Sequence, residues 1–153
     1  MDERRTQLSD YDVSRFQRAQ EITHATAVRE LRNGKKVSHW SWWEIPQIVG
    51  LGRTSTSKDY AIRDLAEAKA YLKNETLRTH LLEICEALLS LETSDAMQVM
   101  GSPDHRKLRS CMTLFSIADP ECKEFQAVLD KFYDGRKDGR TIGILNRGLR
   151  DRS

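Results

Sequence analysis

The side chains best suited to chemistry gather between residues 38 and 60 of the chain. All three tryptophans lie there, at Trp40, Trp42 and Trp43, with His39 before them and the turn Gly50-Leu51-Gly52-Arg53 after them. An indole ring offers a flat apolar wall, and an arginine offers a planar fork of N–H donors that matches phosphate or carboxylate. The segment therefore predicts a pocket for a flat, negatively charged ligand. The alternative is that the tryptophans fill the hydrophobic core, because buried aromatic rings dominate core packing.

The turn at residues 50–53 has a second feature that favours an anion. The residues that follow it, Thr54, Ser55, Thr56 and Ser57, lead into a predicted helix start, and free backbone amides at a helix N-terminus attract negative charge. The glycines follow no strand, and their spacing matches neither a P-loop nor a dinucleotide-binding fingerprint. The alternative is a turn between two helices with ordinary capping residues.

A polar rim on a later helix is placed to close this pocket. Lys107, Ser110 and Thr113 recur at three-residue steps beside an apolar stripe, so they share one side of a helix. The alternative is a solvated boundary of the core. If the rim converges with His39, a tryptophan and Arg53, an aromatic wall with two cations results, which suits a nucleotide-like or phosphorylated ligand. The predicted ligand-binding residues are His39, Trp40, Trp42, Gln47, Arg53, Ser55, Ser57, Tyr60, Lys107 and Ser110.

Catalytic and metal-binding patterns are weak by comparison. His39 is the candidate proton-transfer group, because imidazole side chains exchange protons near neutral pH. The four histidines, His24, His39, His80 and His105, show neither an H-x-x-x-H nor an H-E-x-x-H arrangement, and the cysteines form no C-x-x-C pair. The sequence therefore predicts no metal site and no cofactor, and it leaves open whether the protein is an enzyme.

Bulk composition bounds the partners and the compartment. The chain has 25 basic and 23 acidic residues in 153, a net charge of +2, which favours neither nucleic acid nor a membrane surface as a partner. Cys85, Cys111 and Cys122 are an odd set without disulfide spacing, which favours a reducing compartment. The N-terminus lacks the apolar region of a signal peptide, and no apolar stretch is long enough to span a bilayer. We therefore expect a cytoplasmic protein, of an oligomeric state that the sequence does not specify.

Hydrophobic periodicity predicts an all-α protein, a compact single-domain array of six to eight helices. No β-branched run alternates long enough for a strand. Residues 1–11 are expected to be a flexible segment and residues 12–150 a single helical domain. Pro46 should end any helical turn through the tryptophans by about Glu44. The predicted helices span residues 12–32, 64–72, 74–89, 103–118, 120–133 and 141–149, with shorter turns at 47–49, 57–61 and 94–99. Ser57 is expected to cap the turn at 57–61, Asp64 to cap the helix that follows it, and Asn74 to begin the next one.

Several blocks of sequence in a fixed order resemble one bacterial family. They are Leu31-Arg32-Asn33-Gly34-Lys35-Lys36-Val37-Ser38-His39-Trp40, Pro46-Gln47, Gly50-Leu51-Gly52-Arg53, Gly101-Ser102-Pro103-Asp104 and Met112-Thr113-Leu114-Phe115. They resemble the family called domain of unknown function 1810, whose members are often labelled calpastatin, over about residues 14–145. The resemblance implies a small helical protein and carries no established activity. The chain departs from the pattern at Glu44, where the family has an apolar side chain, so Glu44 is not expected to be a shared catalytic group.

A shorter segment is similar to a second group of proteins. Residues 68–74, with Leu77-Arg78 and Leu81-Leu82, resemble part of the NADAR proteins, which process ADP-ribose conjugates. That similarity implies a polar, aromatic-rich pocket for ADP-ribose and, in some members, hydrolysis of an N-glycosidic bond.

Two hypotheses for function follow. The first is a pocket for an anionic, nucleotide-like small molecule, related to ADP-ribose. The second is a non-enzymatic interaction module whose Trp-rich surface contacts another protein. An enclosed cluster of indole and guanidinium groups would favour the first, and a flat exposed apolar patch would favour the second.

Overall fold

The computed structural model describes the backbone of residues 11–152 and the side chains of residues 11–148, and the described part is built mainly from helices. Residues 11–152 contain nine helices and no sheet, which confirms the predicted all-α class. The number is one above the expected six to eight, because it includes single turns. Six helices are seven residues or longer, and α2, α3 and α6 are single turns. The helices are α1 (Ser14–Arg32), α2 (Ser41–Glu44), α3 (Ser55–Asp59), α4 (Leu65–Lys73), α5 (Glu75–Leu89), α6 (Ala96–Met100), α7 (Asp104–Ala118), α8 (Lys123–Tyr133) and α9 (Gly139–Arg152).

Local side chains determine where several helices begin. Asp64 accepts a hydrogen bond from Glu67 N at the start of α4, and Asn74 accepts one from Leu77 N at the start of α5. These are the N-caps that the sequence predicted. The start of α3 differs from the prediction, because Thr54 is its cap and accepts from Ser57 N. Ser57 lies inside the helix.

The segment around Pro46 forms a helical turn only on its N-terminal side. Helix α2 ends at Glu44, where proline was expected to end it. The predicted turn at residues 47–49 is wrong, because Ile48 forms a parallel bridge with Ile62. Val49 N donates to Ile62 O at 2.8 Å, and Ile62 N donates to Gln47 O at 2.8 Å. This bridge pins the two ends of the loop that carries α3.

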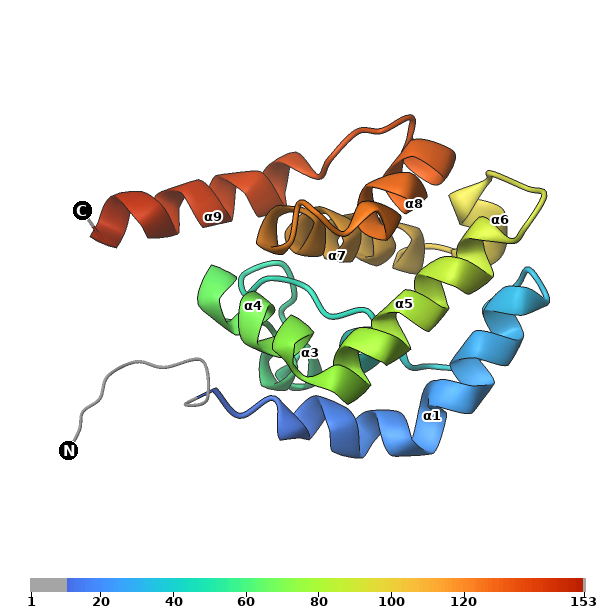
Figure 1. Ribbon diagram of the computed structural model, residues 1–153, viewed down its shortest axis with the longest axis horizontal. Coiled ribbons are helices and arrows are strands. Elements are labelled where there is room, and N and C mark those ends of the chain that lie inside the picture. Colours follow the sequence, from blue (N-terminus) through green and yellow to red (C-terminus); the bar gives the residue numbers. More distant parts are fainter. Residues whose placement is uncertain (1–10, 153) are drawn as a thin grey trace.

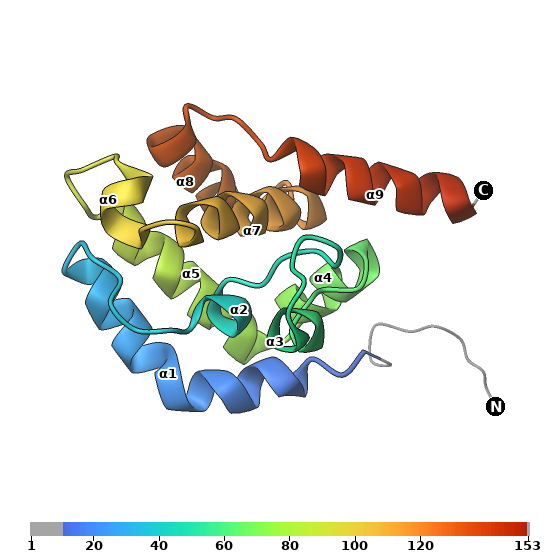
Figure 2. The ribbon, with the colours of Figure 1, turned by 180° about the vertical axis from the view of Figure 1, so that it is seen from behind.

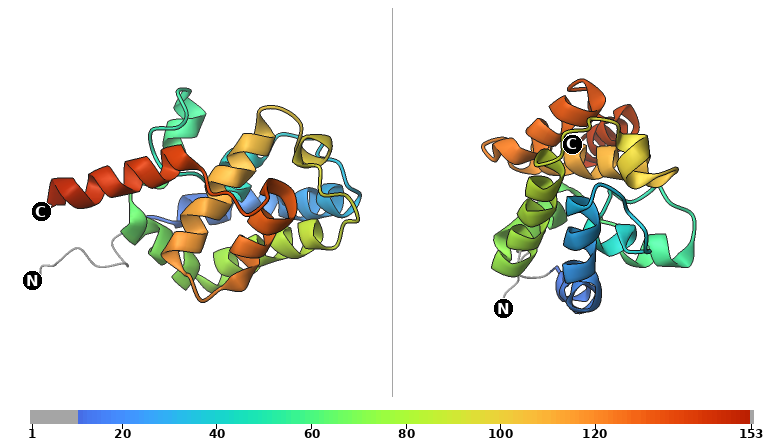
Figure 3. Two further views of the ribbon diagram at one scale, coloured as in Figure 1. Left: turned by 90° about the horizontal axis from the view of Figure 1, so that it is seen from above. Right: turned by 90° about the vertical axis from the view of Figure 1, so that its right-hand side faces the viewer.

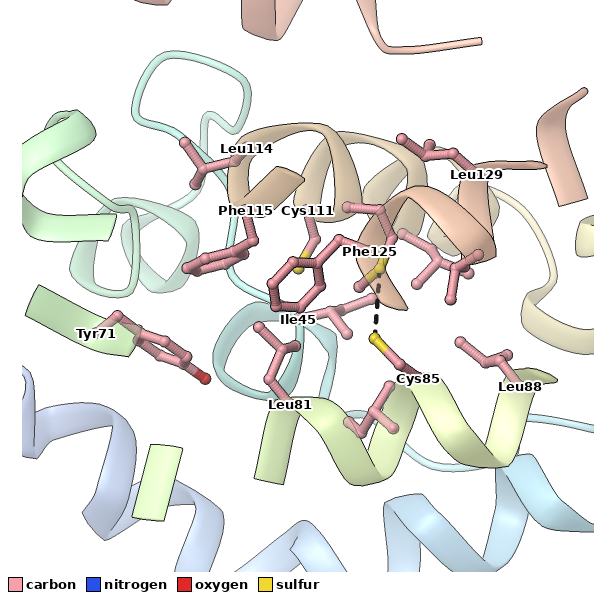
Figure 4. Packing of buried hydrophobic residues seen from close by; sticks show 14 of the residues in the cluster. Ile45, Tyr71, Leu81, Cys85, Leu88, Cys111, Leu114, Phe115, Phe125 and Leu129 are labelled. Atoms are coloured by element: carbon pink, nitrogen blue, oxygen red, sulfur yellow. Dashed lines mark hydrogen bonds between the residues drawn. The ribbon is translucent and has the colours of Figure 1, made fainter. Parts of the chain in front are cut away.

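The long helices pack into one compact domain around α7. Helix α1 lies beside α5, and α7 contacts α4, α8 and α9 (Figures 1 and 2). Seven consecutive residues of α7, 110–116, are buried, which is expected of a helix covered on several sides. Figure 4 shows Phe115 between Tyr71 and Phe125, with Cys85 and Leu81 of α5 facing the same core.

Two peripheral elements stand out from this body. Helix α3 projects from one side, and α9 runs along the top and beyond the end of α7 (Figure 3). None of the described helices combines the length and the apolar character needed to cross a bilayer. The expected flexible segment at residues 1–11 lies, except for Tyr11, outside the described residues.

Candidate functional site

Four of the sequence-predicted residues surround one hollow in the segment from α2 to α4. They are Trp42, Gln47, Ser57 and Tyr60. The free volume is about 10 Å³, which is space for one water molecule at most. Gly52 closes the hollow, since a Cβ atom at this position would lie 2.5 Å from Ser57 and 3.2 Å from Trp42. The side chains around the expected aromatic pocket thus pack against one another and leave no room for a ligand.

Trp40 and Trp43 are held by hydrogen bonds to neighbouring side chains. Trp40 is 1% exposed, and its Nε1 donates to Glu30 Oε1 at 2.9 Å. Trp43 Nε1 donates to Thr23 Oγ1 at 2.9 Å, and its ring lies 5.3 Å from that of Tyr60. Trp40 therefore belongs to the core.

Glu30 organises the backbone that leads to Trp40. Its carboxylate accepts from Val37 N at 2.9 Å, from Ser38 N at 3.1 Å, and from the Ser38 hydroxyl. Burial acts to raise the pKa of Glu30, but these bonds and the one from Trp40 outweigh it and lower the pKa to about 2. The carboxylate thus fixes residues 37–40 against α1.

Lys107 lies against the tryptophan cluster, but a carboxylate already pairs with it. Its Nζ lies 3.8 Å from the centroid of the Trp42 ring and 3.0 Å from Asp104 Oδ1. Lys36 Nζ lies 2.8 Å from Asp104 Oδ2. Burial acts to raise the pKa of Asp104, and the two lysines outweigh it and lower that pKa. One carboxylate thus offsets only part of the charge of two ammonium groups, and both lysines are already paired with it.

The remaining predicted residues lie apart. The side chains of His39, Arg53 and Ser55 are exposed and do not line the hollow beside Trp42. Ser110 Oγ donates to Asp138 Oδ2 at 3.2 Å. Thr113 Oγ1 accepts from Asp138 N at 2.8 Å. Ser110 and Thr113 of the predicted polar rim thus anchor the start of α9.

A larger groove lies between α9 and the loop at residues 48–51. One hollow of about 380 Å³ is walled mostly by apolar side chains, among them Ile48, Leu65, Ile117, Ile144 and Leu145, and also by Arg63 and Asp64. A second, of about 300 Å³, is lined by residues 50–51 and by Gly139, Arg140, Gly143, Ile144 and Arg147. Ile144 and Arg147 line both hollows, so the two form one groove, called here the α9 groove.

Glycines allow the loop and α9 to meet at this groove. Gly50 has φ +101°, and a Cβ atom on it would lie 3.4 Å from Ile144 Cδ1. Arg147 Nη1 lies 3.5 Å from the position of a Cβ on Gly143, so the guanidinium lies over the bare helix backbone. Within the described part of the chain, Arg140 and Arg147 form no ion pair. They give this end of the groove a positive charge.

Sequence reasoning did not select the groove residues of α9. A usable signal was present, because Arg140, Gly143 and Arg147 are separated by three and four residues and so share one helix face. The groove was not predicted because its apolar half also requires Ile48 and Leu65, which are far from α9 in the sequence.

A second polar cluster joins α1, α2 and α5. His24 Nδ1 lies 2.8 Å from Glu44 Oε1, and His24 Nε2 lies 2.6 Å from Glu83 Oε1. The His24 and His80 rings stack with centroids 3.7 Å apart. Burial lowers the pKa of His24, but the two carboxylates outweigh it and raise the pKa overall. Burial, and then the charge of His24, lower the pKa of His80. Glu44 is therefore a structural partner of His24.

The thiols are poor nucleophiles. All three cysteines are free and buried. Burial raises the pKa of the Cys85 and Cys111 thiols well above their usual value, so neither is a thiolate near neutral pH. Cys85 Sγ contacts Met112 Sδ at 3.7 Å inside the core (Figure 4).

Comparison with known proteins places the chain in a family. Residues 10–145 match the family model described as "Protein of unknown function (DUF1810)", so the chain belongs to this family. This confirms the family resemblance found in the sequence. No curated protein matches the chain.

A solved structure has the same fold. It is the crystal structure of the conserved hypothetical protein Rv1873 from Mycobacterium tuberculosis, which is 38% identical to this chain. The TM-score is 0.87, and the match covers 89% of this chain and 97% of that one.

Proposed function

We propose that the α9 groove binds an anionic, nucleotide-like small molecule. The observation that carries the proposal is the pairing of an apolar hollow of about 380 Å³ with an adjoining hollow lined by Arg140 and Arg147. Small-molecule sites are typically concave, mostly apolar and about 300–1,000 Å³ in volume, with a few polar groups that fix orientation. The groove has this composition.

The two halves suit different parts of such a ligand. A flat base fits between Ile48 and Leu65 on one side and Ile144 on the other. A phosphate group then lies by Arg147 and Arg140, where each guanidinium offers a fork of donors. ADP-ribose belongs to this ligand class, and the similarity of residues 68–82 to NADAR proteins makes it the first ligand to test.

The proposal is for binding and not for turnover. Among the described residues that line the groove, Asp64 alone carries a carboxyl group. That group accepts from Glu67 N at 2.9 Å and from Tyr11 Oη at 3.1 Å, so it is committed to the start of α4. His39, the sequence candidate for proton transfer, lines neither hollow.

The second hypothesis, an interaction module with a Trp-rich surface, lacks a supporting observation. The strongly exposed large apolar side chains in the described chain are Ile22, Val37, Val49 and Met97, and no tryptophan is among them. We further propose a cytoplasmic location, supported by the three free cysteines, because such thiols persist in reducing compartments.

Isothermal titration and thermal shift against ADP-ribose, ADP and ATP test the proposal. We expect at least one ligand to bind, Arg147→Ala to weaken binding about tenfold or more, since a charged hydrogen bond contributes about 1.5–3 kcal/mol, and Arg140→Ala to weaken it as well. Arg32→Ala, at the far end of α1, is the matched control and should bind normally. Absence of binding across the panel, or equal binding by the Arg147→Ala variant, would overturn the proposal.

A further inference from the structure

Three side chains with metal-ligand chemistry converge where α1 meets α5. His24 comes from α1, and His80 and Glu83 come from α5. One ligand atom of each lies within 4.8 Å of the others. The sequence predicted no metal site because His24 is far from the other two residues along the chain. The i,i+3 spacing of His80 and Glu83 places both on the face of α5 that meets α1.

Both imidazole rings are oriented through Nδ1. His24 Nδ1 lies 2.8 Å from Glu44 Oε1, and His80 Nδ1 lies 2.8 Å from Gln20 Oε1. Because both partners are hydrogen-bond acceptors, each Nδ1 carries a proton, so Nε2 is the nitrogen that can bind a metal. Without metal, His24 Nε2 shares a proton with Glu83 Oε1 at 2.6 Å, and an ion would have to displace that proton. A carboxylate or amide oxygen behind a histidine is the usual support of a metal ligand.

The groups behind the rings are buried and held in place. The Glu44 side chain is 0% exposed, and its Oε2 accepts from Thr23 Oγ1 at 2.7 Å. Gln20 Nε2 donates to Trp43 O at 2.7 Å and to Tyr71 Oη at 3.0 Å. Glu44 and Gln20 are thus held in place inside the core, and they fix the orientation of the His24 and His80 rings.

The outer side of the cluster is accessible. The side chain of Glu83 is 42% exposed and that of His24 is 12% exposed, and His80 is partly exposed. An ion can therefore reach the three side chains from solvent. Three protein ligands would leave one position for water, as in metal sites that keep an open coordination position.

We propose that His24 Nε2, His80 Nε2 and a Glu83 carboxylate oxygen bind a divalent transition metal ion, with Zn²⁺ as the best match. Two imidazoles and a carboxylate are ligands that zinc accepts in tetrahedral geometry. Tetrahedral bonds of about 2.0–2.1 Å bring ligand atoms to about 3.4 Å from one another. Binding therefore requires ligand atoms that are up to 4.8 Å apart to move closer, while His24 Nε2 and Glu83 Oε1, now 2.6 Å apart, separate to admit the ion. The stacked rings must also turn so that both Nε2 atoms point at it.

A structural network without metal is the competing explanation, since His24 already links Glu44 to Glu83. Two measurements separate the explanations. The protein is freed of metal with EDTA and titrated calorimetrically with Zn²⁺, and then titrated with Co²⁺ while the visible absorption is recorded. Cobalt in a tetrahedral or five-coordinate site gives d–d bands, and a thiolate ligand adds a charge-transfer band.

The variants are chosen so that folding can be checked independently. Glu83→Ala removes the most exposed ligand, and Glu86→Ala, an exposed acid on the same helix, is its control. His80→Ala is the second ligand variant, with the exposed His39→Ala as its control. Glu44→Gln keeps all three ligands and weakens only the support of His24. Thermal unfolding of each variant without metal shows whether it is folded.

We expect one Zn²⁺ per chain, weakened about 100-fold by Glu83→Ala or His80→Ala and unchanged in both controls. Loss of an outer support typically weakens metal affinity about 10- to 100-fold, and Glu44→Gln should fall in that range. The cobalt spectrum should show d–d bands without a thiolate band. Failure to bind Zn²⁺, equal binding by the folded ligand variants, or a thiolate band would each overturn the proposal.

Discussion

The indole Nε1 of Trp40 lies 2.9 Å from Oε1 of Glu30, and both side chains are almost wholly buried. This bond joins α1 to the segment that begins the tryptophan cluster. Glu30 also accepts hydrogen bonds from the backbone amides of Val37 and Ser38. A single carboxylate therefore satisfies backbone donors that lie outside any helix.

The Glu30→Gln variant should be less stable than the wild type by about 2–3 kcal/mol at neutral pH, because a charged acceptor serving several buried donors is lost. Folding lowers the pKa of Glu30 from its ordinary 4.5 to about 2, so the folded state binds fewer protons than the unfolded chain between these values. The stabilisation is complete above pH 4.5 and decreases as the pH falls toward 2.

Urea unfolding of both proteins at several pH values checks this. The stability difference between wild type and variant should shrink through that window. A difference that stays constant with pH would contradict the assignment.

Gly52→Ala should destabilise the protein by about 1–3 kcal/mol, as overpacking of a filled site does. The new Cβ would lie 2.5 Å from Ser57 Cβ, and a Cβ atom cannot move without its helix. Gly148→Ala is the matched control, because nothing lies within 4 Å of its added Cβ. In that helix position alanine should stabilise by about 0.5–1 kcal/mol. Equal midpoints for both variants in thermal unfolding would show that the close approach of Gly52 is unimportant.

Asp138→Ala should loosen the start of α9. Asp138 Oδ2 accepts from Thr141 N at 3.0 Å and Thr141 Oγ1 at 2.6 Å, and Ser110 Oγ reaches the same oxygen. Loss of such an N-cap costs about 1–2 kcal/mol. Hydrogen exchange should accelerate in α9 and remain unchanged in α5. Asp138→Asn, which keeps an acceptor, should show a smaller effect, and unchanged exchange in α9 would refute the anchoring role.

Asp104→Asn should destabilise the protein by about 1 kcal/mol, because a partly buried carboxylate between two ammonium groups is lost. Lys36 and Lys107 lie 2.8 and 3.0 Å from its two oxygens. The destabilisation should become smaller at high salt, where ions screen the pairing. Unfolding free energies at low and high salt check this. A salt-independent difference would mean that hydrogen bonding alone accounts for the effect.

Much of the secondary structure was predictable because its causes are local. Pro46 ended α2 at Glu44, and Asp64 and Asn74 capped the helices that follow them. Apolar side chains at steps of three and four residues identified the long helices, since each helix must bury one stripe. Errors arose where two local signals competed. Thr54, and not Ser57, caps α3, and Ile48 pairs with Ile62 in place of a helical turn.

The candidate sites were much less predictable, because their members meet only after packing. Ile48 and Leu65 form a groove with Ile144 because α9 packs against the loop at residues 48–51. The start of α9 is held by the hydrogen bond from Ser110 to Asp138, and the sequence had assigned Ser110 to ligand binding. His24 and His80 stack only because α1 lies along α5.

By itself the sequence determined the helical class, the main helix limits and the family, since periodicity, caps and motif blocks are properties of short segments. Only the tertiary structure decided which indole is core, where a hollow remains and which imidazoles share a face. These depend on how side chains from distant helices fill space together, and no single segment contains that information.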